Sequence, residues 1–299
     1  MSVIAMSIIG PTASGKSSLA MNLARANPQL ELVSVDSMQV YRGMDIGTAK
    51  PSLRDQAEIP HHLIDLVEAY DDYTVSRFQV DVATALSEIA SRGHQAVMVG
   101  GTGLYLRAAI DQLEIPARYP NIRAELDAEP DTNVLYRQLV ASDPVAADRM
   151  EAENRRRILR ALEVTVGSGR PFSSFGPGLK TYDALDFPIV GLRLDRSMLD
   201  QRIADRLAAQ LDAGFLDEVR GLVDQPEGMS RTARQALGYR ELLSHLAGLI
   251  SLADASDEIA MRTRRFARRQ ERWFRRDPRI TWIDADSDAL GDLTTMLGY

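Results

Sequence analysis

The sequence contains no cysteine and no long uninterrupted run of apolar residues. Without cysteine, the chain forms neither disulfide bonds nor metal sites with thiolate ligands. A membrane-spanning helix needs about 18 or more consecutive apolar residues, so the sequence predicts none. The first apolar stretch has no basic segment before it, and we expect a strand there rather than a signal peptide. These absences favour a cytoplasmic protein.

An excess of positive charge is also missing, because 35 basic residues stand against 42 acidic ones and give a net charge of −7. This balance argues against a protein that coats nucleic acid indiscriminately. Salt screens charges over about 10 Å, so a local basic groove remains compatible with the total. Two segments are strongly basic, Asn154–Arg160 and Arg262–Arg276.

Apolar segments alternate with helical ones and predict an α/β fold. The predicted strands are Val3–Ile9, Leu30–Val35, Ala96–Val99 and Phe187–Leu194, and the predicted helices include Lys16–Arg25 and Val75–Ser91. Such alternation is typical of a parallel sheet with helices on both faces. The fold class that we predict is therefore a parallel sheet of the P-loop type, flanked by helices.

The middle of the chain departs from this alternation. Residues Asn121–Gly167 have helical patterning and no convincing strand. We therefore predict a core domain made of residues 1–115 and 186–299, and a helical insertion domain made of residues 116–185. The end of the core adds the basic helix and a short strand-like segment, RITWIDA.

The segment GPTASGKS has the spacing G-x-x-x-x-G-K-[ST] of a phosphate-binding loop. It lies between a predicted strand and a predicted helix, which is the context that this motif requires. The loop amides and the positive end of the helix attract anionic oxygens, Lys16 adds a charge, and Ser17 can hold Mg²⁺. The predicted phosphate-binding residues are Gly10, Pro11, Thr12, Ala13, Ser14, Gly15, Lys16 and Ser17.

Two further segments follow predicted strands, so they should meet this loop at the carboxyl edge of the sheet. Asp36 can hold magnesium, act as a base, or cap a helix, and its spacing does not choose among these. The glycines around Thr102 favour an ordinary strand-to-helix turn. Adjacent His61 and His62 have no evident third ligand, which favours surface or core roles over a metal site.

The two basic segments have the spacing of amphipathic helices. In the second, Arg265, Arg268, Arg272 and Arg276 fall on one side, while Phe266, Gln270, Trp273 and Phe274 lean to another. The first repeats the pattern with Arg156 and Arg160 aligned. Acidic residues are scarce nearby, and arginine suits bidentate contact with phosphate. These helices therefore predict binding of a polyanion.

Several segments together resemble one family, the tRNA dimethylallyltransferases, also called tRNA isopentenyltransferases. The matching segments are GPTASGKS, SVDSMQVYRGMDIGTAKP, HHLID, GGTGLYLRA, NRRRILRALEV, QALGYRE and TRRFARRQERWFRR. They extend over nearly the whole chain in the family's order. The stretch DSMQVYRGMDIGTAKP is far more specific than the phosphate loop, which many families share.

The resemblance implies transfer of a dimethylallyl group from its diphosphate to the exocyclic amine of the adenine 3′ of the anticodon in tRNA. The loop would then bind the allylic diphosphate through Thr12 and Lys16, with Mg²⁺ held by Ser17. Asp36 would take the proton of the amine, and Arg220 would make a further phosphate contact.

The resemblance also implies contacts with the tRNA anticodon stem-loop, whose adenine would be flipped out of the stack. The insertion domain would clamp the anticodon stem. With a single tRNA as ligand, we expect a monomer. The implied tRNA-binding residues are Asp36, Ser37, Met38, Gln39, Thr102, Arg123, Arg156, Arg157, Ile158, Leu159, Arg160, Arg234, Gln235, Ala236, Leu237, Gly238 and Tyr239.

Three alternatives remain open from the residues. A small-molecule kinase would use the loop for ATP, but it would give the two arginine-rich helices no function. A second alternative is a prenyltransferase that acts on free adenine nucleotides. A mononucleotide, however, has little backbone for these helices to bind. A non-enzymatic RNA-binding protein would keep the loop for structure alone.

Overall fold

The computed structural model describes residues 2–111, 113–176, 178–179 and 181–298, and the chain divides into two compact units. Unit 1 comprises Met1–Ile110 and Ala184–Tyr299, and unit 2 comprises residues 111–183. The boundaries expected from the sequence, after residues 115 and 185, lie slightly further along the chain. Each unit is described by itself.

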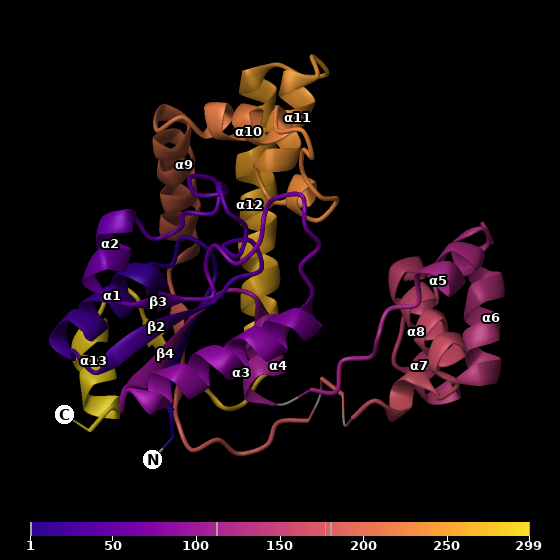
Figure 1. The fold of residues 1–299 in the computed structure, drawn as a ribbon, viewed down its shortest axis with the longest axis horizontal. Coiled ribbons are helices and arrows are strands. Elements are labelled where there is room, and N and C mark those ends of the chain that lie inside the picture. Colours follow the sequence, from indigo (N-terminus) through magenta and orange to yellow (C-terminus); the bar gives the residue numbers. More distant parts are fainter. Residues whose placement is uncertain (1, 112, 177, 180, 299) are drawn as a thin grey trace. The chain divides into compact units, whose positions relative to one another are not determined.

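Unit 1 is built around a six-stranded sheet in which every neighbouring pair is parallel (Figure 1). The strand order is β3-β2-β4-β1-β5-β6. The predicted α/β class with a parallel sheet is confirmed. The strands are β1 (Ile4–Ile9), β2 (Leu30–Val35), β3 (His61–His62), β4 (Gln95–Gly100), β5 (Ile189–Arg193) and β6 (Ile280–Asp284).

Helices cover both faces of this sheet because successive side chains of a strand point to opposite sides. Ile8 of β1 lies in one apolar cluster with α1 (Lys16–Ala26) and α13 (Ala289–Met296). Ile9, the next residue, lies in a second cluster with Phe78 of α3 (Val75–Ser91). The two clusters form the core of unit 1.

The remaining helices of unit 1 follow the strands or extend from β5. They are α2 (Leu53–Glu58), α4 (Gly103–Ile110), α9 (Arg196–Asp212), α10 (Phe215–Val223), α11 (Tyr239–Leu246), α12 (Leu252–Phe274) and the short 3₁₀ turn Ala233–Gln235. The long helix α12 packs against α9 and α11 (Figure 1). No helix in the described ranges has the length and apolar character to cross a membrane.

Helices are the only regular elements in the described residues of unit 2. It contains α5 (Pro120–Asp127), α6 (Thr132–Ser142), α7 (Pro144–Asp148), α8 (Arg155–Ser168) and a 3₁₀ turn at Phe172–Ser174. Leu135 and Leu139 of α6 pack against Ile158 and Leu162 of α8 in an apolar cluster of its own. Buried Asp143 accepts the amide of Ala146 at the start of α7.

A buried carboxylate near the start of β2 explains one of the adjacent histidines. Glu31 is 1% exposed and accepts two hydrogen bonds from the Arg92 guanidinium, at 2.9 and 2.8 Å. His62 Nε2 and His94 Nδ1 lie 2.6 and 2.8 Å from the same carboxylate. Chiefly because of Arg92, the pKa of Glu31 is lowered to about 2 from its ordinary 4.5. His62 therefore serves this cluster, which ties β2 and β3 to the turn before β4.

We predict that Glu31→Gln lowers the free energy of unfolding at pH 7 by about 2 kcal/mol, because it removes the charged acceptor of hydrogen bonds from the partly exposed Arg92. A folded-state pKa below the unfolded value gives stability that is complete above the unfolded pKa and is lost as pH falls. Wild type should therefore lose this contribution between pH 4.5 and 2, and Glu31→Gln should not. Urea unfolding at pH 7 and pH 3 measures both effects. Equal pH dependence in the two proteins would contradict the prediction.

Candidate active site

The carboxyl ends of β1, β2 and β4 are level with one another. Gly100 of β4 is in register with both Ile9 of β1 and Val35 of β2. The segments that follow these three strands therefore begin side by side. The Thr102 amide donates to the Val35 carbonyl oxygen at 3.3 Å, and its hydroxyl accepts from the Ser37 amide at 3.3 Å. The register thus gathers the phosphate loop, Asp36 and Thr102 at one edge of the sheet.

The phosphate loop joins β1 to α1 in a conformation suited to an anion. Gly15 has φ +92°, which side chains rarely adopt, and it stands at the N-cap of α1 without any side-chain cap. A Cβ at Gly10 would lie 2.9 Å from Ser14 Oγ and 3.1 Å from the Leu192 carbonyl oxygen. Because the N-cap residue is Gly15, the first amides of α1 have no side-chain acceptor there that competes with a ligand. They can donate to phosphate oxygens, and the helix dipole favours negative charge there.

Lys16 folds back over this loop. Its ammonium donates to the Pro11 carbonyl oxygen at 3.1 Å. The pKa of Lys16 is lowered to about 8, mainly by burial and also by the charge of Arg206, while the Asp36 carboxylate acts in the opposite direction. Positive charge that is costly in the free protein is stabilised once an anion binds, so these groups prepare a site for an oxyanion.

Arg206 of α9 contacts the phosphate loop, and the sequence analysis did not name it. Its guanidinium donates to Thr12 Oγ1 at 2.8 Å. Burial lowers the pKa of Arg206, and the nearby Asp36 carboxylate raises it. Arg220, which the sequence analysis proposed for this role, pairs instead with Asp217 on the exposed side of α10. The structure therefore places Arg206, and not Arg220, against the phosphate loop.

The two arginines give a matched pair of variants. We predict that Arg206→Ala weakens pyrophosphate binding about tenfold to a hundredfold, because a charged hydrogen bond contributes roughly 1.5–3 kcal/mol. Arg220→Ala should leave this affinity near that of wild type. Calorimetric titration with pyrophosphate and Mg²⁺ measures both. A larger loss in Arg220→Ala than in Arg206→Ala would return the role to Arg220.

Asp36 lies directly after β2, at the same edge of the sheet. Its Oδ1 accepts the Met38 amide at 2.8 Å, a bond within a turn. No helix follows Asp36 in the described chain until α2, so its role as a helix cap is excluded. The electrostatic influence of Asp36 reaches both Lys16 and Arg206. Its carboxylate is half-exposed and remains available as a base or as a ligand of a metal ion.

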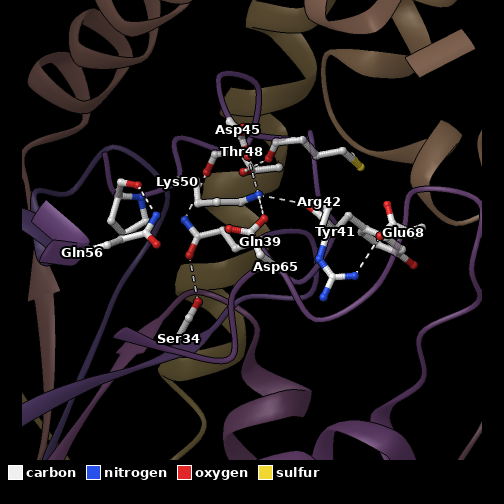
Figure 2. Close-up of polar contacts among 12 residues, drawn as sticks. Ser34, Gln39, Tyr41, Arg42, Asp45, Thr48, Lys50, Gln56, Asp65 and Glu68 are labelled. Carbon is white, nitrogen blue, oxygen red and sulfur yellow. Dashed lines mark hydrogen bonds and ion pairs between the residues drawn. The ribbon is translucent and has the colours of Figure 1, made fainter. Parts of the chain in front are cut away.

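The segment after Asp36 forms a loop that is held by its own polar side chains (Figure 2). The Lys50 side chain is 2% exposed, and its ammonium contacts the Tyr41 carbonyl oxygen at 2.8 Å and Asp65 at 2.6 Å. The Gln39 amide accepts from Ser34 Oγ at 2.8 Å and donates to carbonyl oxygens later in the loop. Much of the most specific motif therefore fixes the loop that presents Asp36.

A carboxylate from α10 anchors the far part of this loop. Glu218 accepts the amides of Asp45 and Ile46 at 2.9 and 2.7 Å and that of Gly47 at 3.1 Å. It also accepts the hydroxyl of Tyr239 at 2.6 Å. Tyr239 is fully buried, and burial raises the pKa of its phenol. Tyr239, which the resemblance implied as a tRNA contact, therefore supports the loop from inside the core.

The glycines after β4 form the expected strand-to-helix turn, and they also admit α12. A Cβ at Gly101 would lie 2.2 Å from Nε2 of Gln270, and one at Gly103 would lie 2.1 Å from the Trp273 ring. Gln270 donates to the Gly101 carbonyl oxygen at 2.9 Å and accepts the Thr12 amide at 2.9 Å. The basic helix therefore packs directly on the edge of the sheet that carries the phosphate loop.

The arginines of α12 and the two that follow it, Arg275 and Arg276, fall into two groups. Arg262, Arg264 and Arg275 pair with acidic residues. Within the ranges that the structure describes, the other five form no ion pair, and they include every member of the predicted arginine face. Arg268 is half-exposed, and the exposed ones are Arg265, Arg269, Arg272 and Arg276. Unpaired guanidinium groups on one helix are what a polyanion site requires.

In unit 2, the arginines at the start of α8 divide in the same way. Arg156 and Arg157 are exposed. Arg160 pairs with Glu163 at 2.7 Å and donates to the Pro116 carbonyl oxygen at 2.7 Å. Arg123 lies 3.9 Å from the same glutamate and is one third exposed. Arg156 and Arg157 are therefore the freest to meet an external anion, and Arg160 and Arg123 also hold the unit together.

Four implied tRNA contacts have side chains in the core and not on a surface. Ile158 and Leu159 lie in the apolar cluster of unit 2, and Ala236 and Tyr239 lie in that of unit 1. Matching a motif cannot separate residues that touch a ligand from those that hold the motif's helix in place. The exposed or half-exposed members of the set are Asp36, Ser37, Met38, Gln39, Thr102, Arg123, Arg156, Arg157, Arg160, Arg234, Gln235 and Leu237.

The protein groups at the loop suit Mg²⁺ held jointly with a phosphate ligand. Magnesium prefers hard oxygen ligands and is usually held by one or two protein oxygens together with substrate phosphates. Among the described residues, no group of three or more histidine and acidic side chains is placed to hold a metal ion by itself. The exposed Ser17 hydroxyl at the start of α1, with Asp36 near the loop, fits the sparser arrangement.

A family model described as IPP transferase matches residues 39–277, well over half of the chain. The chain is 45% identical to the tRNA dimethylallyltransferase of a Nocardioides species, over 96% of this chain and 93% of that protein. It is 43% identical to the tRNA dimethylallyltransferase of Bifidobacterium animalis subsp. lactis, over 96% of this chain and 84% of that protein.

Solved structures give the same result. The full-length tRNA isopentenylpyrophosphate transferase of Bacillus halodurans aligns with a TM-score of 0.71 at 34% identity, covering 99% of this chain and 95% of that one. A eukaryotic dimethylallyltransferase acting on tRNA aligns with a TM-score of 0.81 at 27% identity. That alignment covers 99% of this chain and 78% of the eukaryotic one.

Proposed function

The chain belongs to the IPP transferase family, the tRNA dimethylallyltransferases, and we propose that its phosphate loop binds the diphosphate of the prenyl donor. The reaction moves a dimethylallyl group from dimethylallyl diphosphate to the exocyclic amine of the adenine 3′ of the anticodon in tRNA. The observation that carries the proposal is the contact between the phosphate loop and α12, on which Arg265, Arg268, Arg269 and Arg272 form no ion pair with any described residue. A kinase for small molecules would have no use for this helix.

Loss of the diphosphate is the step that the loop assists. The amine nitrogen forms a bond to the allylic carbon while the bond from that carbon to the diphosphate oxygen breaks. An adenine amine is a weak nucleophile, so stabilising the leaving diphosphate lowers the barrier most. Lys16 and Arg206 supply positive charge, and the amides at the start of α1 donate to the departing oxygens. Thr12 presents its hydroxyl beside Arg206.

Asp36 is the base in this proposal. The amine must lose a proton when it becomes bonded to the prenyl carbon, and the Asp36 carboxylate takes it. Asp36 stands at the end of β2, level with the end of β1 from which the phosphate loop starts. The acceptor amine and the leaving diphosphate would therefore be served from neighbouring strand ends.

Mg²⁺, held by Ser17 and the diphosphate, would neutralise part of the negative charge on the leaving group. The protein would act on tRNA in the cytoplasm, and as a monomer, because one copy of the chain per tRNA is sufficient.

The adenine 3′ of the anticodon is stacked in free tRNA, so it must leave the stack to approach Asp36. The arginine face of α12 and the exposed Arg156 and Arg157 of unit 2 would bind the RNA backbone.

The arginine face allows a prediction about salt. We expect the double variant Arg268→Ala, Arg272→Ala to bind tRNA more weakly and to lower the slope of log affinity against log salt by about 1 to 2, since each phosphate contact contributes about 0.7 to 0.9. Arg275→Ala is the control, because Arg275 is already paired with Glu271. Binding isotherms from low to high salt measure the slopes. An equal change in the control would show that the face has no special role.

A transfer assay tests the proposed function. Purified protein, Mg²⁺ and labelled dimethylallyl diphosphate are combined with unmodified tRNA that has adenine 3′ of the anticodon. A tRNA with guanine at that position and free AMP serve as parallel acceptors. Label in the adenine tRNA alone supports the proposal. Label in AMP would instead favour a nucleotide prenyltransferase.

A further inference from the structure

One buried amide links the RNA-binding helix to the phosphate loop. Gln270 lies in the last turns of α12 and is 7% exposed. Its Oε1 accepts the Thr12 amide at 2.9 Å, and its Nε2 donates to the Gly101 carbonyl oxygen at 2.9 Å. A single side chain thus joins segments that follow β1 and β4, from a helix more than 150 residues further along the chain.

We propose that Gln270 is a positioning residue that sets the geometry of the phosphate loop from α12. The proposal rests on the function given above, because it takes the loop to bind the diphosphate of the prenyl donor. Thr12 is held at two of its polar groups. Its amide is held by Gln270, and its hydroxyl is held by Arg206. The backbone amide and the side-chain hydroxyl of Thr12 are therefore both fixed by helices outside the strand–loop–helix motif, α12 and α9.

The surroundings of Gln270 make this contact rigid. Gly101 and Gly103 leave no space for a Cβ, because Gln270 and Trp273 fill the places where those atoms would lie. A Cβ on Gly101 would also lie 3.3 Å from the Gly10 carbonyl oxygen. The turn after β4, the start of the phosphate loop and α12 are therefore packed in contact. A buried amide in such a place stays paired, because an unpaired one costs the desolvation of its polar atoms.

The consequence concerns which amides meet the ligand. Since the Thr12 amide is occupied by Gln270, the loop offers the diphosphate its later amides, around Gly15 and Lys16, and the Thr12 hydroxyl. Loss of Gln270 would release the Thr12 amide and the Gly101 carbonyl oxygen together. The loop would then become ordered only when the ligand binds, and the free energy of that ordering would lower the affinity for the ligand.

The test compares Gln270→Met with wild type in the full-length chain. Methionine has similar length but makes neither hydrogen bond. Calorimetric titration with inorganic pyrophosphate and Mg²⁺ should show affinity about tenfold to a hundredfold weaker, as expected for two lost hydrogen bonds. Affinity for tRNA should stay unchanged, because the arginine face is untouched. In turnover, kcat/KM for dimethylallyl diphosphate should fall, and KM for tRNA should stay at the wild-type value.

Two further variants separate positioning from stability. Thr263→Val alters another buried polar side chain of α12, two turns earlier, and should bind pyrophosphate like wild type. Gln270→Leu carries no charge and also makes neither hydrogen bond, but it differs from methionine in shape. It should also lose affinity, and it serves if Gln270→Met does not fold.

The inference is overturned if folded Gln270 variants bind pyrophosphate like wild type, or if they lose tRNA affinity to the same extent. Wild type that binds pyrophosphate but transfers no prenyl group would overturn the proposed function alone. The pyrophosphate titrations would still decide the role of Gln270 in that case. Wild type that fails to bind pyrophosphate would overturn both.

Discussion

Lys16→Met should reduce kcat for prenyl transfer about a thousandfold, because one preorganised charge on a developing oxyanion is worth that much in rate. Lys16 contacts the Pro11 carbonyl oxygen within the phosphate loop, and burial lowers its pKa to about 8. A lysine kept there against the cost of burial is suited to an anionic partner. Single-turnover transfer with saturating tRNA measures the effect on chemistry without contribution from product release.

Binding measurements show whether Lys16 acts on the leaving group. Lys16→Met should bind tRNA like wild type and bind pyrophosphate more weakly. Lys16→Arg, which keeps the charge on a larger group, should recover part of the pyrophosphate affinity. Turnover of Lys16→Met close to wild type would mean that the loop is structural, as in the alternative of a non-enzymatic RNA-binding protein.

Asp36→Ala should lower kcat by about a hundredfold to ten-thousandfold, the range in which general bases contribute. The Oδ1 of Asp36 also accepts the Met38 amide, so part of any effect could come from the turn. Asp36→Asn separates the two roles, since its amide oxygen can keep the turn but cannot accept a proton. If Asp36 is the base, Asn and Ala variants should be similarly slow and should both bind tRNA.

Near-normal turnover of Asp36→Asn would exclude Asp36 as the base. Loss of tRNA affinity in both variants, with unchanged chemistry on bound tRNA, would make Asp36 a binding residue only. Rapid mixing of preformed complexes distinguishes a defect in chemistry from one in binding.

The sequence was sufficient to predict the features that depend on neighbours along the chain. The phosphate loop, Asp36 and the turn at Thr102 each follow an apolar strand, so their position at one edge of a parallel sheet could be inferred. The extent of β2 and α3 matches the predicted ranges, because apolar period and length set those boundaries. The arginine face of α12 was also predicted from helical spacing.

The residues that the sequence missed reach the loop from far along the chain. Arg206 and Gln270 meet Thr12 across 194 and 258 residues. No periodicity tells which of two arginines on neighbouring helices turns inward, so Arg220 was named where the structure has Arg206. Gln270 did leave a signal, an amide among the aromatic residues of an arginine-rich helix. Only packing shows what that amide holds.

The central claim is that the phosphate loop serves a prenyl donor and the basic helix serves tRNA. The most direct test supplies wild type with dimethylallyl diphosphate, ATP, Mg²⁺ and unmodified tRNA together, then digests the tRNA and identifies the nucleosides by mass spectrometry. The account predicts a dimethylallyl group on the adenine 3′ of the anticodon, absent with Lys16→Met, and no consumption of ATP. A phosphorylated product with unmodified adenine would contradict it and assign the loop to a kinase.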